Sequence, residues 1–525
     1  TYAHQDSLPS LPVPALEDTL GKLLDTARPF LDTTEMEHME AVVDDFRKGA
    51  GPTLQRLLEA RAAEERNWLE EWWESFAYLQ PRYPSAININ WHGLMPQGSL
   101  TASQCESAAL LLRHVLMFRE RLISETLEPE TMAGQKLCMF QYYRMFNSCR
   151  VPGEEMDTIE VWEDRSLRHI AVLHKNAVYT FNVIGEDGAI LPYSDLLACV
   201  VFSQFEAVLA AGAGWLGTTD SPVSVLTSEE RTTWAKARDH LVKLDARNVA
   251  SLEAVESAIT VVVLEDHIAS GLEALAKDAL HGNGRNKWFD KPFNMIVFQD
   301  GRTATNGEHS WADAMVVVKM FADVMVTMDA ELKSTGWPAR GTPSPGLAPP
   351  TKLEWVVDAT ATQAIELASA NLSVMIKSVD LTVLEFNHFG KGFIKRYKLV
   401  PDFFVQLAIQ LAYYRLHHDI TAVYESGHTR LFYHGRTETI KATTTDSVAF
   451  VKAMCDDTVK VGVVFALLKA AIATHLAFTR DVLMGKGVDR HLMGLYILSK
   501  MTGMTPTPSL FTEKGFLVSK MYKLS

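Results

Sequence analysis

Cysteine is scarce in this 525-residue sequence, and its scarcity excludes a disulfide-stabilised scaffold. The chain has only five cysteines, and no two of them have the spacing of a CxxC pair. A low, odd number of cysteines without metal-ligand spacing is typical of proteins from a reducing compartment. We therefore predict an intracellular protein with no metal site.

Positive charge is also in short supply. Lys and Arg together number 50 against 64 for Asp and Glu, which gives a formal net charge of -14 at pH 7. Proteins that bind nucleic acids present a basic surface to the phosphates, so this balance argues against a nucleic-acid partner. An anionic ligand would need a local basic patch.

The sequence has no long, purely apolar run. Its longest apolar stretch, residues 196–217, is interrupted by Gln204 and Glu206 and becomes rich in glycine towards its end. A membrane-spanning helix needs about 20 predominantly apolar residues, so we interpret this stretch as a buried helix followed by a loop. We expect no transmembrane segment, and no signal-peptide pattern follows Thr1.

The sequence otherwise has the composition of a large globular protein. Apolar residues make up 47% and charged residues 22%, both close to the averages for globular chains. The length corresponds to two large domains or about three ordinary ones. Residues 336–350 are rich in proline and glycine, as linkers are, and strand-like and helix-like segments alternate on both sides of them. We predict an α/β protein with two large halves.

Local patterns predict several individual elements. Helical periodicity runs through residues 16–79 and 103–127, and returns between 228 and 280. The apolar run at 294–298, closed by Asp300-Gly301, predicts a strand and a turn. After the linker we expect a strand and then a long helix that begins near Ala361.

The most informative stretch is NGEHSWAD at residues 306–313. His309 stands between a predicted strand and an apolar helical segment, a common place for a catalytic side chain. Asp313 lies four residues further on, near the histidine if the helix begins between them. A histidine with a nearby carboxylate is a base with an orienting partner. The alternative is a packed histidine followed by an aspartate that caps the helix.

Several longer blocks carry a family resemblance. They are RNWLEEWW at 66–73, LCMFQYYRMFNSCRVPG at 137–153, RNKWFDK at 285–291 and QLAYYR at 410–415. Together with the histidine motif, these blocks resemble the carnitine/choline acyltransferase family over the whole chain.

The resemblance implies an α/β fold with two chloramphenicol-acetyltransferase-like domains. Each domain would have a mixed sheet covered by helices, with the active-site channel between the domains. Residues 1–90 would form a helical segment that packs on the second domain, residues 91–345 the first domain with the catalytic histidine, and residues 346–525 the second domain.

The resemblance also implies a reaction. An acyl group would pass reversibly between the thioester of CoA and the hydroxyl of carnitine. His309 would act directly as the general base, without an acyl-enzyme, because a hydroxyl is a poor nucleophile until a base takes its proton. Asp313 would support and orient the histidine. CoA and carnitine are then substrates, and no tightly bound cofactor is expected.

By the same resemblance, Tyr424, Thr437, Arg490 and Ser525 would bind carnitine. The carboxylate of carnitine needs a cation with hydroxyl donors beside it, and these residue types supply both. Choline has no carboxylate, so this set favours carnitine over choline. Without the resemblance, none of the four residues stands out from ordinary core or surface positions.

The segment FGKGFIKRYK at 389–398 is strongly basic in an otherwise acidic chain. It supplies the local patch that a phosphate ligand requires, although a solvated basic loop would have the same composition. The resemblance matches Lys391 and Lys395 to contacts with the phosphates of CoA. Asp402 and Glu425 would lie on the same side of the CoA site.

Further blocks resemble the medium-chain (octanoyl) branch of the family, which acts in peroxisomes. They are DSLPSLPVP at 6–14, LTSEERTTWAKAR at 226–238 and YHGRTET at 433–439. We therefore expect a monomeric, peroxisomal enzyme that transfers medium-chain acyl groups. A preference for short or long acyl chains remains an alternative.

The sequence ends at Ser525, where the family continues with a Ser-Thr-Ser motif. One serine of that motif helps to stabilise the oxyanion of the transition state. We therefore expect an active enzyme to extend beyond Ser525, and no targeting signal is present in this sequence. The alternative of a different class is a truncated, non-catalytic product that binds CoA or has a regulatory role.

Overall fold

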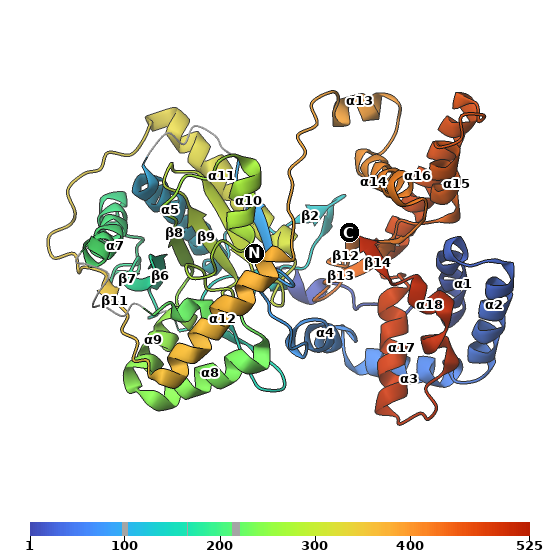
Figure 1. The fold of residues 1–525 in the computed structure, drawn as a ribbon, viewed down its shortest axis with the longest axis horizontal. Coiled ribbons are helices and arrows are strands. Elements are labelled where there is room, and N and C mark those ends of the chain that lie inside the picture. The colour runs from blue at the N-terminus through green and yellow to red at the C-terminus, as the bar shows by residue number, and fades with distance from the viewer. Residues whose placement is uncertain (97–102, 165, 213–220) are drawn as a thin grey trace. The chain divides into compact units, whose positions relative to one another are not determined.

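The computed structural model describes residues 1–96, 103–164, 166–212 and 221–525 (Figure 1). The chain forms two compact units. The first unit consists of Thr1–Tyr2, Trp73–Glu128 and Met139–Leu384, and the second of Ala3–Trp72, Pro129–Cys138 and Glu385–Ser525. Each unit is therefore assembled from segments that are distant in the sequence.

A seven-stranded mixed sheet forms the centre of the first unit, in the order β1-β10-β9-β8-β6-β7-β11. β6 and β9 both run parallel to β8, and the other neighbours pair antiparallel. The strands are β1 (Trp91–Leu94), β6 (His169–His174), β7 (Ala177–Asn182), β8 (Val261–Leu264), β9 (Phe293–Val297), β10 (Thr303–Gly307) and β11 (Thr351–Lys352). This sheet and its helices confirm the predicted α/β class.

Helices cover both faces of this sheet (Figure 1). Successive side chains of a strand point to opposite faces, so β6 directs Val172 to one apolar cluster and Leu173 to the other. The first cluster includes α5 (Gln104–Ile123), α7 (Tyr193–Gly212) and α11 (Ala314–Thr335). The second includes α8 (Arg231–Leu244), α9 (Ala246–Glu256), α10 (Leu272–Leu280) and α12 (Ala359–Lys377).

Shorter elements complete the first unit. They are η3 (Ser75–Leu79), α6 (Phe140–Tyr143), the antiparallel pair β4 (Ser148–Val151) and β5 (Thr158–Val161), and η4 (Val223–Ser228); α4 (Glu70–Glu74) crosses the boundary between the units.

The structure confirms some of the predicted elements of the first unit and contradicts one of them in part. The strand predicted at 294–298 is confirmed as β9, and Gly301, with a φ of 83°, forms the turn into β10. The helical prediction for 228–280 is wrong at β8, a central strand whose four residues, Val-Val-Val-Leu, are all buried. A short strand buried on both faces has no amphipathic pattern, so periodicity cannot distinguish it from a buried helix.

The proline- and glycine-rich stretch 336–350 lies inside the first unit. Directly after it, β11 pairs with β7 at the edge of the large sheet, and α12 packs into the second apolar cluster. The chain leaves the first unit only after Leu384. The structural division thus comes later than the predicted linker, because β11 and α12 add to the first sheet and its covering helices.

The second unit has a smaller sheet of three strands, in the order β13-β12-β14. β12 and β13 are antiparallel, and β14 runs parallel to β12. The strands are β12 (Ala422–His428), β13 (Thr437–Lys441) and β14 (Tyr522–Leu524), and a separate hairpin is formed by β2 (Thr131–Met132) and β3 (Gln135–Lys136).

Two groups of helices accompany the small sheet. One group shares a single apolar cluster and comprises α13 (Lys391–Arg396), α14 (Pro401–His417), α15 (Thr445–Ala453) and α16 (Val461–Leu483). The other comprises α1 (Leu16–Ala27), α2 (Thr33–Lys48), α3 (Gly51–Glu64), α17 (Asp489–Met501) and α18 (Lys514–Val518). Asn67 donates from its side-chain amide to the carbonyls of Tyr433 and His434 at 3.0 and 2.9 Å, which joins the N-terminal segment to the β12–β13 connection.

One helix among the described residues is long and apolar enough to cross a membrane. It is α16, which has 23 residues and contains an 18-residue window with a mean hydropathy of 1.9, of which 22% is buried. Length and composition alone are weak evidence for a membrane span, because core helices also meet this test. The stretch 196–217, predicted as helix and loop, is helical in α7 as far as Gly212, and residues 213–217 lie outside the described part of the chain.

Candidate active site

His309 lies in the loop between β10, which ends at Gly307, and α11, which begins at Ala314. Its ring Nδ1 is 3.0 Å from the carbonyl oxygen of Ala312. A carbonyl oxygen can only accept, so Nδ1 carries a proton, and whenever the ring is neutral its lone pair is on Nε2. The ring of Tyr78 stacks on the half-buried imidazole, with centroids 5.4 Å apart and planes 28° apart. The local geometry therefore presents a histidine with a defined tautomer.

Glu308 anchors the histidine loop. Its carboxylate accepts hydrogen bonds from the backbone N–H of Ser310 at 2.9 Å and from the Ser310 hydroxyl at 2.5 Å. The guanidinium of Arg150 pairs with the other carboxylate oxygen at 2.9 Å and also donates to the carbonyl of Tyr78 at 2.6 Å. Arg150 thus holds both the loop that carries His309 and the segment that carries its stacking partner.

Arg150 belongs to a larger buried charge network. Asp157 pairs with both Arg150 and Arg231 at 2.7 Å, and Arg231 pairs with Asp290 at 2.7 Å. Burial alone would raise the pKa of Asp157, but the two guanidinium groups hold it below its usual value. We did not identify this network from the sequence, because its members are far apart along the chain.

Asp313, the predicted orienting carboxylate, precedes the first residue of α11. The helix therefore begins after Asp313 and not between it and His309. The side-chain NH2 of Gln141 donates to the Asp313 carboxylate at 3.2 Å, and the side-chain Oε1 of Gln141 accepts the backbone N–H of Asp313 at 2.8 Å. Gln141 was missed as a candidate, although it lies within one of the family-like blocks. The role of Asp313 stays a prediction.

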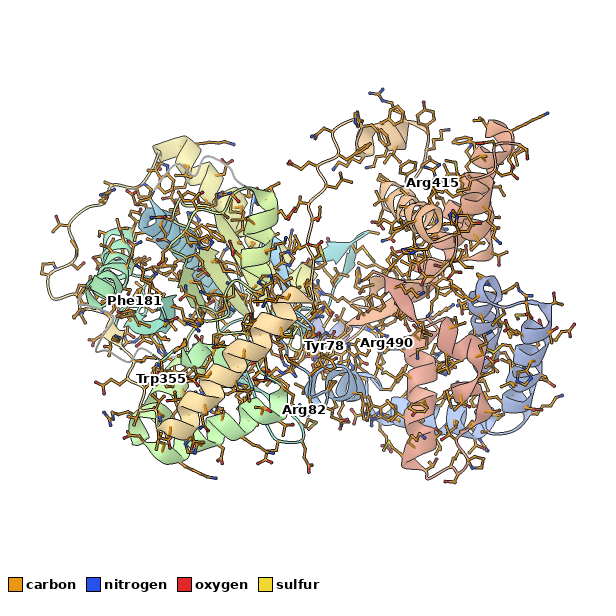
Figure 2. The ribbon with its side chains drawn as sticks, viewed as in Figure 1. Tyr78, Arg82, Phe181, Trp355, Arg415 and Arg490 are labelled. Atoms are coloured by element: carbon orange, nitrogen blue, oxygen red, sulfur yellow. The ribbon has the colours of Figure 1, made fainter. Side chains whose placement is uncertain are left out.

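The structure brings three of the predicted carnitine residues together in the second unit. Arg490, in the first turn of α17, donates from Nε to the carbonyl of Thr437 at 3.1 Å (Figure 2 labels Arg490). Burial alone would lower the pKa of Arg490. Glu438 and Tyr424 raise it by more, so the pKa of Arg490 stands above its usual value. The same contacts place Tyr424 on β12 and Thr437 on β13 beside one buried cation.

Ser525, the fourth predicted carnitine residue, directly follows β14. β14 runs parallel to β12, with Leu524 opposite Val423. Tyr522 at the start of β14 packs its ring edge-to-face on Tyr424, with centroids 5.3 Å apart. The backbone of Ser525 is thus next to the strand that carries Tyr424.

The predicted CoA residues also belong to the second unit. Lys391 and Lys395 are exposed on α13, which packs on α14. Asp402, at the start of α14, has a raised pKa because of its burial and the nearby Glu425 carboxylate on β12. Glu425 in turn pairs with the buried His475 of α16 at 2.7 Å. The structure therefore brings Asp402 and Glu425 together and adds His475, which the sequence analysis did not single out.

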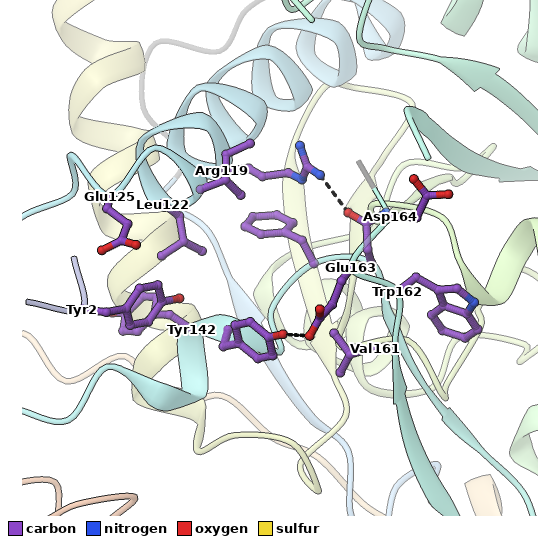
Figure 3. A pocket seen from close by; sticks show the side chains of 13 residues that line it. Tyr2, Arg119, Leu122, Glu125, Tyr142, Val161, Trp162, Glu163 and Asp164 are labelled. Carbon is purple, nitrogen blue, oxygen red and sulfur yellow. Dashed lines mark hydrogen bonds between the residues drawn. The ribbon is translucent and has the colours of Figure 1, made fainter. Parts of the chain in front are cut away.

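A separate surface pocket of about 420 Å³ lies in the first unit (Figure 3). Its walls include Tyr2, Arg119, Tyr142 and Trp162, and Arg119 donates across it to the Oδ1 of Asn147 at 2.9 Å. Among the residues that the structure describes, none of the predicted site residues lines this pocket.

The fold and the side chains above define a class: an α/β protein with a histidine loop at the end of β10 in the large sheet and a buried arginine among hydroxyl groups. The profile of the choline/carnitine O-acyltransferase family matches residues 11–525. The chain belongs to this family, which confirms the resemblance drawn from the sequence blocks.

The chain is similar to members of the family that differ in their named acyl group. It is 36% identical to carnitine O-acetyltransferase of Mus musculus, over 100% of this chain and 84% of the relative. It is 35% identical to peroxisomal carnitine O-octanoyltransferase of Bos taurus, over 98% and 85%. It is 34% identical to the liver isoform of carnitine O-palmitoyltransferase 1 of Homo sapiens, over 95% of this chain and 65% of the relative. These nearly equal identities do not resolve the predicted octanoyl branch.

Proposed function

We propose that this protein transfers an acyl group reversibly between CoA and carnitine, with His309 as the general base. The observation that carries the proposal is the contact between His309 Nδ1 and the Ala312 carbonyl. In a neutral ring this contact makes Nε2 the basic nitrogen, and a general base needs such a nitrogen to accept a proton. Family membership supplies the substrate class.

The proposed reaction proceeds without an acyl-enzyme. His309 Nε2 takes the proton of the carnitine hydroxyl while the hydroxyl oxygen attacks the thioester carbonyl carbon of acyl-CoA. The tetrahedral oxyanion then collapses, the carbon–sulfur bond breaks, and the CoA sulfur takes the proton back from Nε2. In reverse, Nε2 deprotonates the CoA thiol. His309 thus ends each turnover in its starting state.

Two groups of side chains in the second unit would hold the substrates. Arg490 pairs with the carnitine carboxylate, with Tyr424, Thr437 and Ser525 as hydroxyl donors. The CoA phosphates bind Lys391 and Lys395, and the Asp402 and Glu425 carboxyl groups accept hydrogen bonds from CoA. This assignment rests on the family resemblance, on the clustering of Tyr424 and Thr437 around Arg490, and on the proximity of Asp402 to Glu425. Asp313 has a supporting role near the base.

The test of the base is the substitution His309→Ala in the full-length protein. General acid–base catalysis contributes about 10²- to 10⁴-fold, so kcat should fall by at least about 100-fold. CoA affinity, measured by isothermal titration calorimetry, should stay within about twofold. His240→Ala is the matched control, because His240 is a half-exposed histidine of the same unit that pairs with Asp358. Unchanged turnover in His309→Ala would exclude the mechanism.

For the acyl group we propose a medium chain, on the resemblance of three sequence blocks to that branch. The test compares kcat/KM for acetyl-CoA, octanoyl-CoA and palmitoyl-CoA with carnitine as acceptor. A maximum at octanoyl-CoA would support the proposal, and a maximum at either end would assign a short-chain or long-chain enzyme. CoA binding without turnover on any of the three would favour the non-catalytic alternative.

We also propose a monomer in peroxisomes. Two similar proteins, from Bos taurus and Homo sapiens, carry peroxisomal in their names. Co-localisation of the full-length protein with a peroxisomal marker and sedimentation at a single-chain mass are the expected results.

A further inference from the structure

A buried carboxyl group stands beside the arginine of the proposed carnitine site. Glu438 lies on β13 between Thr437 and Thr439, and only 4% of it is exposed. Its carboxylate accepts the backbone N–H of Thr439 at 2.7 Å and the backbone N–H of Arg490 at 3.1 Å. Glu438 is therefore fixed at the N-terminal end of α17, the same helix end that positions the Arg490 guanidinium.

The surroundings of Glu438 leave it little water. A Cβ placed on Gly487 would lie 2.2 Å from the Glu438 Cγ, so the turn before α17 covers the carboxyl group closely. The N-terminal segment contributes apolar walls, including Pro14 and Trp68. Burial raises the pKa of Glu438 to about 7, although Arg490 partly offsets it. The group therefore exchanges protons in the physiological range.

The charged groups that face this position come from several elements. On α17 they are Arg490 and Asp489, and His491 lines the same small cavity. Lys441 of β13 is already engaged by Asp489, at 2.9 Å, and by the Tyr522 hydroxyl, at 2.7 Å. Lys520 also acts on Glu438, and its own pKa is lowered by burial. Glu438 is thus the anion whose charge acts most strongly on the Arg490 guanidinium.

A carboxylate ligand would add a second negative charge beside the Arg490 guanidinium. If the carnitine carboxylate pairs with Arg490, two negative charges share one guanidinium in a poorly solvated place. A like charge nearby disfavours the ionised form of a carboxyl group, and the proton is the least costly way to remove that repulsion. By linkage, a ligand that favours the protonated form must bind together with a proton. Glu438 is the carboxyl group placed to take it.

We infer that Glu438 takes up a proton from solvent when the carnitine carboxylate binds to Arg490, and so couples carnitine affinity to pH. This inference rests on the proposed function. The new O–H bond forms on a Glu438 carboxylate oxygen, while its sister oxygen continues to accept a backbone N–H. A cavity of about 20 Å³ beside Glu438, lined also by Thr429 and Thr437, is the size of one water molecule that could accept from the new O–H.

Calorimetry measures the coupling directly. Carnitine is titrated into the full-length protein at pH 7.5 in two buffers of different ionisation enthalpy, PIPES and Tris. The difference between the two observed enthalpies gives the number of protons taken up per bound ligand. We expect an uptake of about 0.5 proton for carnitine, because a group that titrates near pH 7 is mostly ionised in the free protein at that pH.

Two comparisons assign the proton to Glu438. The primary amide of carnitine keeps the hydroxyl and the trimethylammonium but lacks the carboxylate, so it should bind without proton uptake. Glu438→Gln, a neutral mimic of the protonated group, should bind carnitine with an uptake below about 0.1 proton. Glu513→Gln is the matched control, because Glu513 is another buried glutamate of the same unit and caps α18. It should behave as the unchanged protein.

The pH dependence of affinity provides a second readout that a purely structural role would not alter. Between pH 6.5 and 8.5 the affinity of the unchanged protein should fall by about threefold to tenfold. In Glu438→Gln it should change by less than about twofold. If Glu438→Gln does not fold, the test uses the unchanged protein alone. Proton uptake on binding carnitine, together with no uptake on binding its amide, would then support the inference.

Three results would overturn the inference. Carnitine binding without proton uptake would refute it and leave the proposed function intact. Uptake that persists in Glu438→Gln would refute it and point to another group, with Lys520→Met as the next variant. No carnitine binding at all would overturn the proposed function, and the inference with it.

Discussion

The two compact units use buried charge in opposite ways. In the first unit, Asp157 pairs with both Arg150 and Arg231, Asp290 pairs with Arg231, and all four side chains are at most 1% exposed. In the second unit, burial raises the pKa of Glu438 to about 7 beside Arg490. A closed network of opposite charges fixes geometry, whereas a cluster with a titrating member can respond to a charged ligand.

The difference corresponds to what each unit has to do in the proposed reaction. A general base must be held in one position and one tautomer, and the closed network reaches the His309 loop through Arg150 and Glu308. A site for a zwitterion must instead accept a new charge in a buried place. The same residue types therefore serve two ends. Fully paired arginines and carboxylates would hold the proposed base in place, whereas an arginine beside a carboxyl group that titrates would let the proposed substrate site change its charge.

The largest effect should follow from opening the closed network. Arg150→Met leaves Asp157 and Glu308 without a shared partner, and breaking a buried ion pair on one side costs about 3 to 5 kcal/mol. Guanidinium-induced unfolding followed by tryptophan fluorescence would measure this loss. Arg247→Met is the control, since that pair with Asp245 is partly exposed and should contribute less than about 1 kcal/mol. If both variants lost the same free energy of unfolding, the buried network would stabilise the protein no more than an exposed ion pair does.

The second prediction concerns a neutral buried group of the second unit. The His491 ring contacts the Thr19 hydroxyl at 2.7 Å and the side-chain Oε1 of Gln55 at 2.9 Å. Burial lowers the pKa of His491 to about 4. The unfolded chain binds the proton near pH 6.5 and the folded protein only near pH 4. The stabilisation is therefore complete above pH 6.5 and is lost as the pH falls towards 4.

The expected loss over this window is about 3 kcal/mol, since one pKa unit corresponds to about 1.4 kcal/mol. Unfolding curves of the unchanged protein and of His491→Gln, measured at several values between pH 7 and 4.5, would test it. The variant should lack this part of the pH dependence. Parallel curves for the two proteins would show that another group is responsible.

The third prediction tests the cation of the second unit. Arg490→Gln removes the group that we propose as the partner of the carnitine carboxylate, and a hydrogen bond to a charged group is worth about 1.5 to 3 kcal/mol. The KM for carnitine should rise by about 10- to 150-fold with little change in the KM for acyl-CoA. Arg415→Gln, at an exposed position of α14, is the control. A similar rise in both Michaelis constants would indicate general damage rather than loss of a specific contact.

The smallest effect should come from Tyr78, the stacking partner of His309, the proposed base. Tyr78→Leu removes a ring that stacks on His309, and aromatic pairs contribute about 0.5 to 1.5 kcal/mol beyond their buried area. We expect kcat to fall by about 2- to 12-fold with unchanged thermal stability. Tyr83→Leu, at a side chain that is 48% exposed, should have no effect. Full activity in Tyr78→Leu would show that the carbonyl of Ala312 suffices to orient the ring.

Features encoded by neighbouring residues could be predicted from the sequence. The strand at 294–298, its Asp300-Gly301 turn and the helix after residue 103 were predicted from local patterns and appear in the structure. β8 could not be predicted, because its burial on both faces comes from helices elsewhere in the chain. In the candidate site, too, only features with a local sequence pattern could be predicted.

The sequence located His309 through its position between a strand and a helix. It did not locate Gln141, Arg150 or His475, because each acquires its partner only through the fold. The carnitine and CoA residues came from family resemblance alone, since an isolated threonine, tyrosine or arginine has no distinguishing local pattern. Contacts across long sequence separations are the information that the sequence alone did not supply.

The division of the chain also has a consequence for biosynthesis. The helices of Ala3–Trp72 belong with Glu385–Ser525, so about 300 residues separate them from their partners. At about 5 to 20 residues per second, the ribosome needs roughly 15 to 60 s to synthesise that interval. During this time the large segment Met139–Leu384 of the first unit can collapse on the growing chain, while α1, α2 and α3 still lack their partner helices α17 and α18. A chaperone that binds nascent chains should therefore be retained longest on the N-terminal helices.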